Sequence, residues 1–242
     1  MMTLSSFLYT HAGGRSYNED AAGAWELPNS GLYIVADGLG GQVHSEQASA
    51  AVIKCLAEAE KPGEEENGAD WLRDRIREAN DRVLALQEET HSNMKSTVVA
   101  LLVRGDRASW ANVGDSRLYY IHDREISAVT EDHSVAYKKY KAGEITREQI
   151  GTDEDQSALL RALGNAERYE PALNGAAGPL TPGDGFLLCS DGLWEFIRDG
   201  EILIDFLKSD TPEKWAERLM LRAMDRFVPE HDNLSLITVM VR

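Results

Sequence analysis

Three apolar segments follow one another so closely that they limit the topology of the whole chain. Residues Thr97–Arg104, Ala108–Val113 and Arg117–His122 are rich in β-branched and aromatic side chains, which predicts strands. Only three residues separate each segment from the next. Because a parallel crossover takes about a dozen residues or more, these strands must be antiparallel neighbours. The sequence therefore disfavours a doubly wound α/β topology.

Helices and further strands surround this block. Apolar residues recur at helical spacing in His44–Glu60 and Trp71–Glu89, which predicts two long amphipathic helices. A third helix is expected from Thr211, a capping residue followed by Pro212, to about Arg226. Strands packed as two sheets with helices outside would accommodate this order. The other predicted strands are Phe7–Ala12, Leu32–Ala36, Arg168–Leu173, Gly185–Ser190 and Leu234–Val241.

The segment from Glu131 to about Asn165 differs from the rest of the chain. It contains short helical pieces of mixed charge and no clear strand pattern. We expect it to form a mobile flap inserted into one domain that spans residues 1–242, a length that a single core can fill.

Composition limits the partners and the compartment. The chain has 25 basic and 41 acidic residues, a net charge of −16, which disfavours nucleic acid as a partner. Its longest uncharged apolar run, Val98–Val103, is far short of a membrane span, and the first residues lack the pattern of a signal peptide. Cys55 and Cys189 lie in apolar segments and are expected to be reduced thiols. We therefore expect a cytoplasmic protein, without a membrane partner and monomeric.

Aspartate next to glycine recurs where predicted strands end. Asp37 and Asp191 each follow an apolar run and precede a glycine, and Asp115 follows Gly114. Any one of these pairs is typical of a tight turn. Repeated at several strand ends, they indicate carboxylates aimed at one point, which repel one another unless a cation lies between them. Ligands that are all oxygen favour Mg²⁺ or Mn²⁺ over zinc.

Further residues add the other parts of a phosphate site. Glu19 and Asp20 follow Arg15 closely, and Asp232 lies directly before the last strand. A planar guanidinium beside metal ions is suited to binding a phosphate dianion. Together these residues indicate metal-assisted phosphoester hydrolysis, in which two ions activate a water and neutralise charge on the phosphoryl oxygens.

Seven segments carry a family resemblance. In chain order they are RSYNED, VADGLGG, STVVALLV, ANVGDSR, TEDHS, LCSDGLWE and HDNLS. They resemble the PPM/PP2C family of metal-dependent Ser/Thr protein phosphatases in its compact bacterial form. The resemblance implies an α+β fold, a four-layer αββα sandwich of two antiparallel sheets flanked by helices, with a flap that matches Glu131–Asn165.

The same resemblance implies an activity and its partners. It implies hydrolysis of phosphoserine and phosphothreonine in proteins by a metal-activated water at a binuclear Mn²⁺ or Mg²⁺ centre. The expected partners are phosphorylated proteins, the substrates of a Ser/Thr kinase, and the kinase itself.

Site roles follow from the resemblance as well. Arg15 is similar to the arginine that receives the substrate phosphate, and Glu19 and Asp20 are similar to residues that hold metal-bound waters. The implied metal ligands are Asp37, which bridges both core ions, the Gly38 carbonyl on one of them, Asp191 and Asp232 on the other, and Asp115 at a third, weaker site.

The chain also departs from the family pattern. Many members carry a histidine after the Asp-Gly pair, thought to donate a proton to the leaving alkoxide, but Leu39 stands there and cannot do so. The proton donor is therefore unassigned. Gln42 and Ser45 replace a usual histidine and glycine, changes expected to affect the start of the first long helix rather than the chemistry. Glu195 stands where some relatives have a third-metal aspartate, so affinity for a third ion could differ.

Two other functions stay open, and two chemistries are disfavoured. A catalytically silent phosphoprotein-binding domain could share the fold, although such a module need not keep mutually repelling acids. A phosphatase of small phosphoesters differs only in its substrates. A cysteine phosphatase needs an arginine six residues after its thiol, and Cys189 and Cys55 lack one. The chain also has no phosphate-binding loop ending in Gly-Lys-Ser/Thr.

Overall fold

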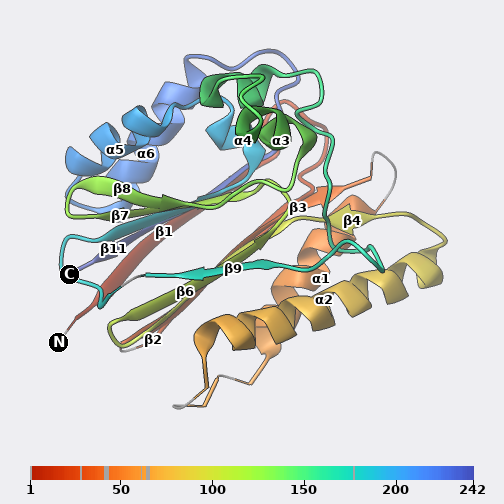
Figure 1. Cartoon of the computed structure of the whole chain (residues 1–242), viewed down its shortest axis with the longest axis horizontal. Helices are drawn as coiled ribbons and strands as arrows, with labels where there is room; N and C mark the ends of the chain where they lie inside the picture. The colour runs from red at the N-terminus through yellow and green to blue at the C-terminus, as the bar shows by residue number, and fades with distance from the viewer. Residues whose placement is uncertain (1, 28, 41–43, 61, 64–65, 177) are drawn as a thin grey trace.

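Two antiparallel sheets lie face to face with helices on both outer sides in the computed structural model, which describes residues 2–27, 29–40, 44–60, 62–63, 66–176 and 178–242 (Figure 1). The strands are β1 (Leu4–His11), β2 (Asp20–Leu27), β3 (Ser30–Leu39), β4 (Lys95–Ser96), β5 (Val98–Arg104), β6 (Arg107–Val113), β7 (Arg117–His122), β8 (Glu125–Val129), β9 (Ala172–Gly175), β10 (Gly185–Cys189) and β11 (Leu234–Val241). The helices are α1 (Ser45–Glu58), α2 (Gly68–Thr90), α3 (Val135–Lys141), the 3₁₀-helix η1 (Arg147–Thr152), α4 (Asp191–Trp194), α5 (Asp199–Leu207) and α6 (Pro212–Met224).

The two sheets take strands from distant parts of the chain. One has the order β1-β11-β10-β7-β8, so the first and last strands are neighbours. The other has the order β2-β3-β5-β6-β9, with β4 paired to β3. The close block of β5 and β6 pairs antiparallel as expected, but β7 crosses to the other sheet and pairs with β10 and β8. The turn between β6 and β7 therefore joins the two sheets.

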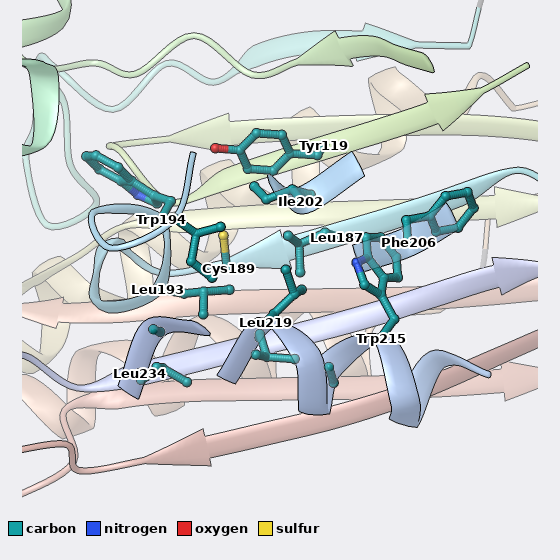
Figure 2. Packing of buried hydrophobic residues seen from close by; sticks show 14 of the residues in the cluster. Tyr119, Leu187, Cys189, Leu193, Trp194, Ile202, Phe206, Trp215, Leu219 and Leu234 are labelled. Atoms are coloured by element: carbon teal, nitrogen blue, oxygen red, sulfur yellow. The ribbon is translucent and has the colours of Figure 1, made fainter. Parts of the chain in front are cut away.

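Alternation along the strands explains the four layers. Tyr33 and Val35 of β3 pack between the sheets, whereas Ile34 and Ala36 face α1 and α2. Both faces of the central strands are thus apolar, and each sheet buries one face on the other sheet and one on helices. On the other outer side, α5 and α6 cover β7, β10 and β11 through a cluster that includes Trp215 (Figure 2).

Most predicted elements are confirmed, with several differences. Thr211 caps α6 as expected, its Oγ1 accepting a hydrogen bond from the Lys214 amide at 3.2 Å, with Pro212 in the first turn. The predicted strand Arg168–Leu173 is wrong, because the strand is β9, Ala172–Gly175. The sequence patterns missed β2, β4, β8, α4 and α5.

The segment between Glu131 and Asn165 contains α3 and η1 and leaves the sheets at one end (Figure 1). Its two ends pair with each other, because the Leu160 amide donates to the His133 carbonyl at 2.7 Å and Ser134 bridges Leu159. Lys139 of α3 binds the later part of this segment through ion pairs of 2.8 Å with Asp153 and Asp155.

Within the described residues, no helix combines the length and apolar character that crossing a membrane requires. Both cysteines are free thiols.

Candidate active site

Acidic residues from both sheets meet at the end of the sandwich where the connection between β6 and β7 crosses over. Asp20, the first residue of β2, lies opposite Asp37 in the β2–β3 register. Asp115 lies in the β6–β7 turn, Asp191 begins α4 one residue after β10, and Asp232 lies one residue before β11. Asp37, Asp115 and Asp191 are the positions that the Asp-Gly pattern indicated, although β3 runs on through Asp37 and Gly38 to Leu39.

Burial and mutual repulsion change how these acids bind protons. Burial, opposed by hydrogen bonds from serines, raises the pKa of Asp20 to about 6, and burial beside Asp132 raises the pKa of Asp115 to about 7. The pKa values of Asp37 and Asp191 lie well above the usual range, first through burial and then through repulsion by the other acids of this group. The protein's own cations therefore compensate the negative charge gathered here only in part, through Arg15 on Asp232 and Arg117 near Asp115.

The donor chemistry fits a hard divalent cation. The Oδ2 atom of Asp20 accepts a hydrogen bond of 2.8 Å from Ser190, whereas its Oδ1 is buried without a hydrogen-bond partner among the described residues. An orphaned carboxylate oxygen among repelling acids is what an oxygen-binding ion would stabilise. The arrangement in this structure is nevertheless not that of a ligand shell, because no three His, Cys, Asp or Glu side chains in the described ranges are placed to hold one ion.

Glycines allow the backbone to approach closely at two of the aspartates. A Cβ on Gly38 would lie 2.4 Å from the Ser45 carbonyl oxygen and 2.6 Å from that of Glu19. A Cβ on Gly192 would lie 2.0 Å from the Asn233 carbonyl oxygen. A side chain at either position would clash with backbone, so the glycine after each aspartate is required sterically as well as for turn formation.

Arg15 lies at the exposed rim of the acidic group. Its Nη2 is 3.1 Å from Asp232 Oδ2, and the two side chains are 52% and 44% exposed. The remaining guanidinium donors are accessible to a ligand from solvent. The other oxygen of Asp232, Oδ1, accepts a hydrogen bond from the Asn233 amide at 2.8 Å.

For Glu19, the structure shows contacts of the main chain. Its carbonyl accepts hydrogen bonds from the Gly38 amide at 3.1 Å and from Ser49 Oγ at 2.5 Å. Its amide donates to Asn233 Oδ1 at 2.7 Å. These bonds fix the start of β2 against β3 and α1, so that Asp20 enters the acidic group.

Asn233 is a structural residue of the site that the sequence reasoning did not assign. It is buried, and its Nδ2 donates to the carbonyls of Ala12 at 2.9 Å and Tyr17 at 2.8 Å, in addition to its bond with Glu19. The loop that carries Arg15 is therefore fastened to the segment that carries Asp232. The HDNLS motif contained the signal, because an Asp-Asn pair before a strand commonly binds backbone.

Gln156 is a second residue that sequence patterns missed. It reaches from the segment after η1 and donates through Nε2 to Glu195 and, at 3.5 Å, to Asp191 Oδ2. Burial and repulsion from Asp115 raise the pKa of Glu195 to about 8. A polar residue in a loop of mixed charge has no sequence signature that would separate it from solvent-exposed neighbours.

The departures noted in the sequence lie beside this group. Leu39 ends β3, and Ser45 is the buried first residue of α1, which follows His44 in a left-handed conformation (φ 97°). Gln42 lies outside the described residues.

Comparisons with known proteins agree with this architecture. Residues 9–227 match the family model described as protein phosphatase 2C. The chain is 35% identical over 238 residues to the serine/threonine phosphatase Stp of Listeria welshimeri, covering 93% of this chain and 90% of that protein. The solved structure of the serine/threonine phosphatase Stp1 from Staphylococcus aureus superposes with a TM-score of 0.88 at 32% identity, covering 99% of this chain and 96% of that one.

A further solved structure holds metal. It is the catalytic domain of the serine/threonine protein phosphatase PstP in complex with two manganese ions, similar with a TM-score of 0.85 and 30% identity over 100% of this chain and 99% of that one. The family model matches most of the chain, the relatives are more than 30% identical, and the fold is shared. The chain therefore belongs to the protein phosphatase 2C family of Ser/Thr phosphatases.

Proposed function

We propose that this phosphatase depends on Mn²⁺ or Mg²⁺ and removes phosphate from phosphoserine and phosphothreonine in proteins. The observation that carries the proposal is the group of buried acids whose burial and mutual repulsion raise their pKa values. The two manganese ions of the PstP structure support the same reading by similarity.

Each acid has a proposed place in the centre. Asp37 would bridge two core ions, the Gly38 carbonyl would bind one, Asp191 and Asp232 would bind the other, and Asp115 would hold a third. Bound there, the ions would lower the pKa of the attacking water and neutralise charge on the phosphoryl oxygens.

The other residues act on the substrate and on water. Arg15, half exposed and held by Asp232, would exchange part of that ion pair for charge-assisted hydrogen bonds to the substrate phosphate. Glu19 and Asp20 would orient water, Asp20 through the Oδ1 atom that lacks a partner among the described residues. Leu39 has no proton to donate, so the leaving alkoxide must take its proton from another group.

The substrates and setting follow from the relatives and the composition. We propose that the chain acts as a monomer in the cytoplasm on substrates of a Ser/Thr kinase and on the kinase itself. The two free cysteines fit a reducing compartment, and the net charge of −16 does not favour nucleic acid.

Hydrolysis of a phosphothreonine peptide with Mn²⁺, Mg²⁺ or EDTA tests the proposal. We expect turnover with either ion, none with EDTA, and loss of turnover in Asp191→Asn because a charged ligand is removed. Asp123→Asn is the matched control, since Asp123 is 88% exposed in the β7–β8 turn. Calorimetric titration of Mn²⁺ should show weaker binding in Asp191→Asn only.

Three results would contradict the proposal. Full turnover in EDTA would exclude metal dependence. Peptide binding without turnover at saturating ion would indicate a silent phosphoprotein-binding domain. Hydrolysis of p-nitrophenyl phosphate but not of phosphopeptides would indicate a phosphatase of small phosphoesters.

A further inference from the structure

The β6–β7 turn, which carries Asp115, is hydrogen-bonded on two sides to elements that carry other acids of the site. On one side, the hydroxyl oxygens of Ser116 and Thr97 are 2.7 Å apart. Thr97 in turn donates from its amide to the Asp37 carbonyl at 2.8 Å and accepts from the Asp37 amide through Oγ1 at 3.0 Å. On the other side, Trp194 of α4 donates from its indole Nε1 to the Asp115 carbonyl at 3.0 Å.

The bond from Trp194 is buried and acts on the backbone at Asp115. The Trp194 side chain, part of the apolar cluster in Figure 2, is 4% exposed, and Asp115 is 3% exposed. A carbonyl that loses its donor inside the protein is destabilising, so this bond restricts the turn to one position. Because α4 begins with Asp191, the bond also sets the place of Asp115 relative to Asp191.

A buried guanidinium orients the indole ring. The Cζ atom of Arg117 lies 3.5 Å from the centroid of the Trp194 ring, which is a cation–π contact. Arg117 is held by Asp132 through two contacts, from Nε to Oδ1 at 2.9 Å and from Nη2 to Oδ2 at 2.6 Å. The indole N–H is therefore directed at the Asp115 carbonyl by residues of β7 and of the segment before α3.

We infer that Trp194 is a positioning residue for Asp115, whose indole N–H keeps the β6–β7 turn where the Asp115 carboxylate can bind the third, weaker ion. The inference rests on the proposed function, because that ion belongs to the proposed centre. Partners that orient a metal ligand typically contribute about 10- to 100-fold to metal affinity. Trp194 contacts the main chain of Asp115 and not the acids proposed for the two core ions, so those ions should not depend on it.

Trp194→Phe tests this role, because it keeps a ring for Arg117 and removes the N–H. In a calorimetric titration with Mn²⁺, we expect affinity for the weaker ion to fall about 10- to 100-fold, with the two tighter ions unchanged. The matched control is Trp71→Phe, which removes an indole bond of the same length, 3.0 Å, to the Glu60 carbonyl beside α2. This control should leave the binding of every ion unchanged.

Urea unfolding without metal separates positioning from a purely structural role. Both phenylalanine variants lose one indole hydrogen bond, so both should lower the free energy of unfolding. If Trp194→Phe lowers the free energy of unfolding and leaves the affinity for the weaker ion unchanged, as Trp71→Phe should, the inference is overturned.

Asp115→Ala distinguishes failure of the inference from failure of the proposed centre. If Asp115→Ala loses the weaker ion and Trp194→Phe keeps it, only the inference fails. If Asp115→Ala still binds the weaker ion, the proposed third site is wrong and the inference fails with it. Turnover of a phosphothreonine peptide by wild type with Mn²⁺ would still support the rest of the proposed function.

NMR of the wild-type indole groups gives a second measurement, which does not depend on whether Trp194→Phe folds. During a titration with Mg²⁺, the Trp194 indole N–H signal should shift over the concentrations that fill the weaker site. The same signal should not shift over that range in Asp115→Ala, and the Trp71 indole signal should not shift in either protein. A Trp194 signal that stays constant while the weaker site fills in wild type would overturn the inference.

Discussion

At the scale of single residues, Arg15 has two competing partners, Asp232 in this structure and a phosphate in the proposed reaction. Charge-assisted hydrogen bonds contribute about 1.5–3 kcal/mol each. Arg15→Ala should therefore lower kcat/KM for a phosphothreonine peptide by roughly 10- to 150-fold, at about 1.4 kcal/mol per factor of ten. Most of the loss should fall on KM, because the contact forms already when the substrate binds.

Arg15→Lys is the conservative variant, and it should recover only part of the loss because an ammonium lacks the two-pronged geometry. Affinity for Mn²⁺, measured by calorimetry, should not fall in Arg15→Ala, since Asp232 gains freedom when its ion pair is lost. An unchanged KM in Arg15→Ala would remove this residue from the phosphate site.

At the scale of elements, Lys139 holds α3 to the segment that follows η1 through Asp153 and Asp155. Lys139→Ala should speed cleavage by trypsin or a broad protease between residues 142 and 158, because this region then opens at a lower free-energy cost. The thermal midpoint of the whole protein should change little. Lys214→Ala, which removes an exposed pair with Asp210 at the start of α6, is the control.

A second connection between elements is buried. The Arg117–Asp132 pair, 5% and 1% exposed, joins β7 to the residues that precede α3, and Arg117 also stacks on Trp194 of α4. Asp132→Ala leaves a buried guanidinium without its counter-charge, which typically costs about 3–5 kcal/mol. Chemical denaturation should show this loss, and a change under about 1 kcal/mol would mean that water reaches Arg117.

At the scale of the whole molecule, His133 makes stability depend on pH. Its Nδ1 accepts a hydrogen bond from the Gly114 amide at 3.2 Å, so the ring is neutral in the folded chain. Burial, then the positive charge of Arg161, opposed by Glu131, lowers the pKa of His133 to about 4, against about 6.5 in an unfolded chain. Between these values the unfolded chain binds the proton more readily, so this contribution to stability is lost as pH falls.

His133→Asn keeps a hydrogen-bond acceptor for Gly114 but cannot be protonated. The free energy of unfolding of wild type relative to His133→Asn should therefore fall as pH is lowered from about 7 to 4. Urea unfolding of both proteins across this range measures this difference in the free energy of unfolding. Titration of the buried acids contributes to both proteins alike and therefore cancels in the difference. A difference that stays constant with pH would contradict the assignment.

The elements that were predicted correctly are those whose pattern of apolar residues matches the faces that the fold buries. Helix α2 has an apolar stripe at helical spacing, and β5 is a continuous apolar run buried on both faces. Strand β2 was missed because its alanines and glycine have low strand propensity, and it is a strand through its pairing with β3. Helix α5 spans only nine residues, Asp199–Leu207, which are too few turns for a helical period to be recognised from the sequence.

The sequence by itself determined the antiparallel pairing of β5 and β6, the helices α1, α2 and α6, and the acids and arginine proposed for the site, because these depend on strand spacing, periodicity and short motifs. Only the tertiary structure decided that β7 changes sheets, that Asn233 ties the Arg15 loop to the Asp232 segment, and that Gln156 reaches Asp191. It alone also showed that Arg147 Nη2 is buried without a hydrogen-bond partner among the described residues. These features join residues far apart in the chain, and such contacts depend on how the two sheets and the helices pack, which no local pattern encodes.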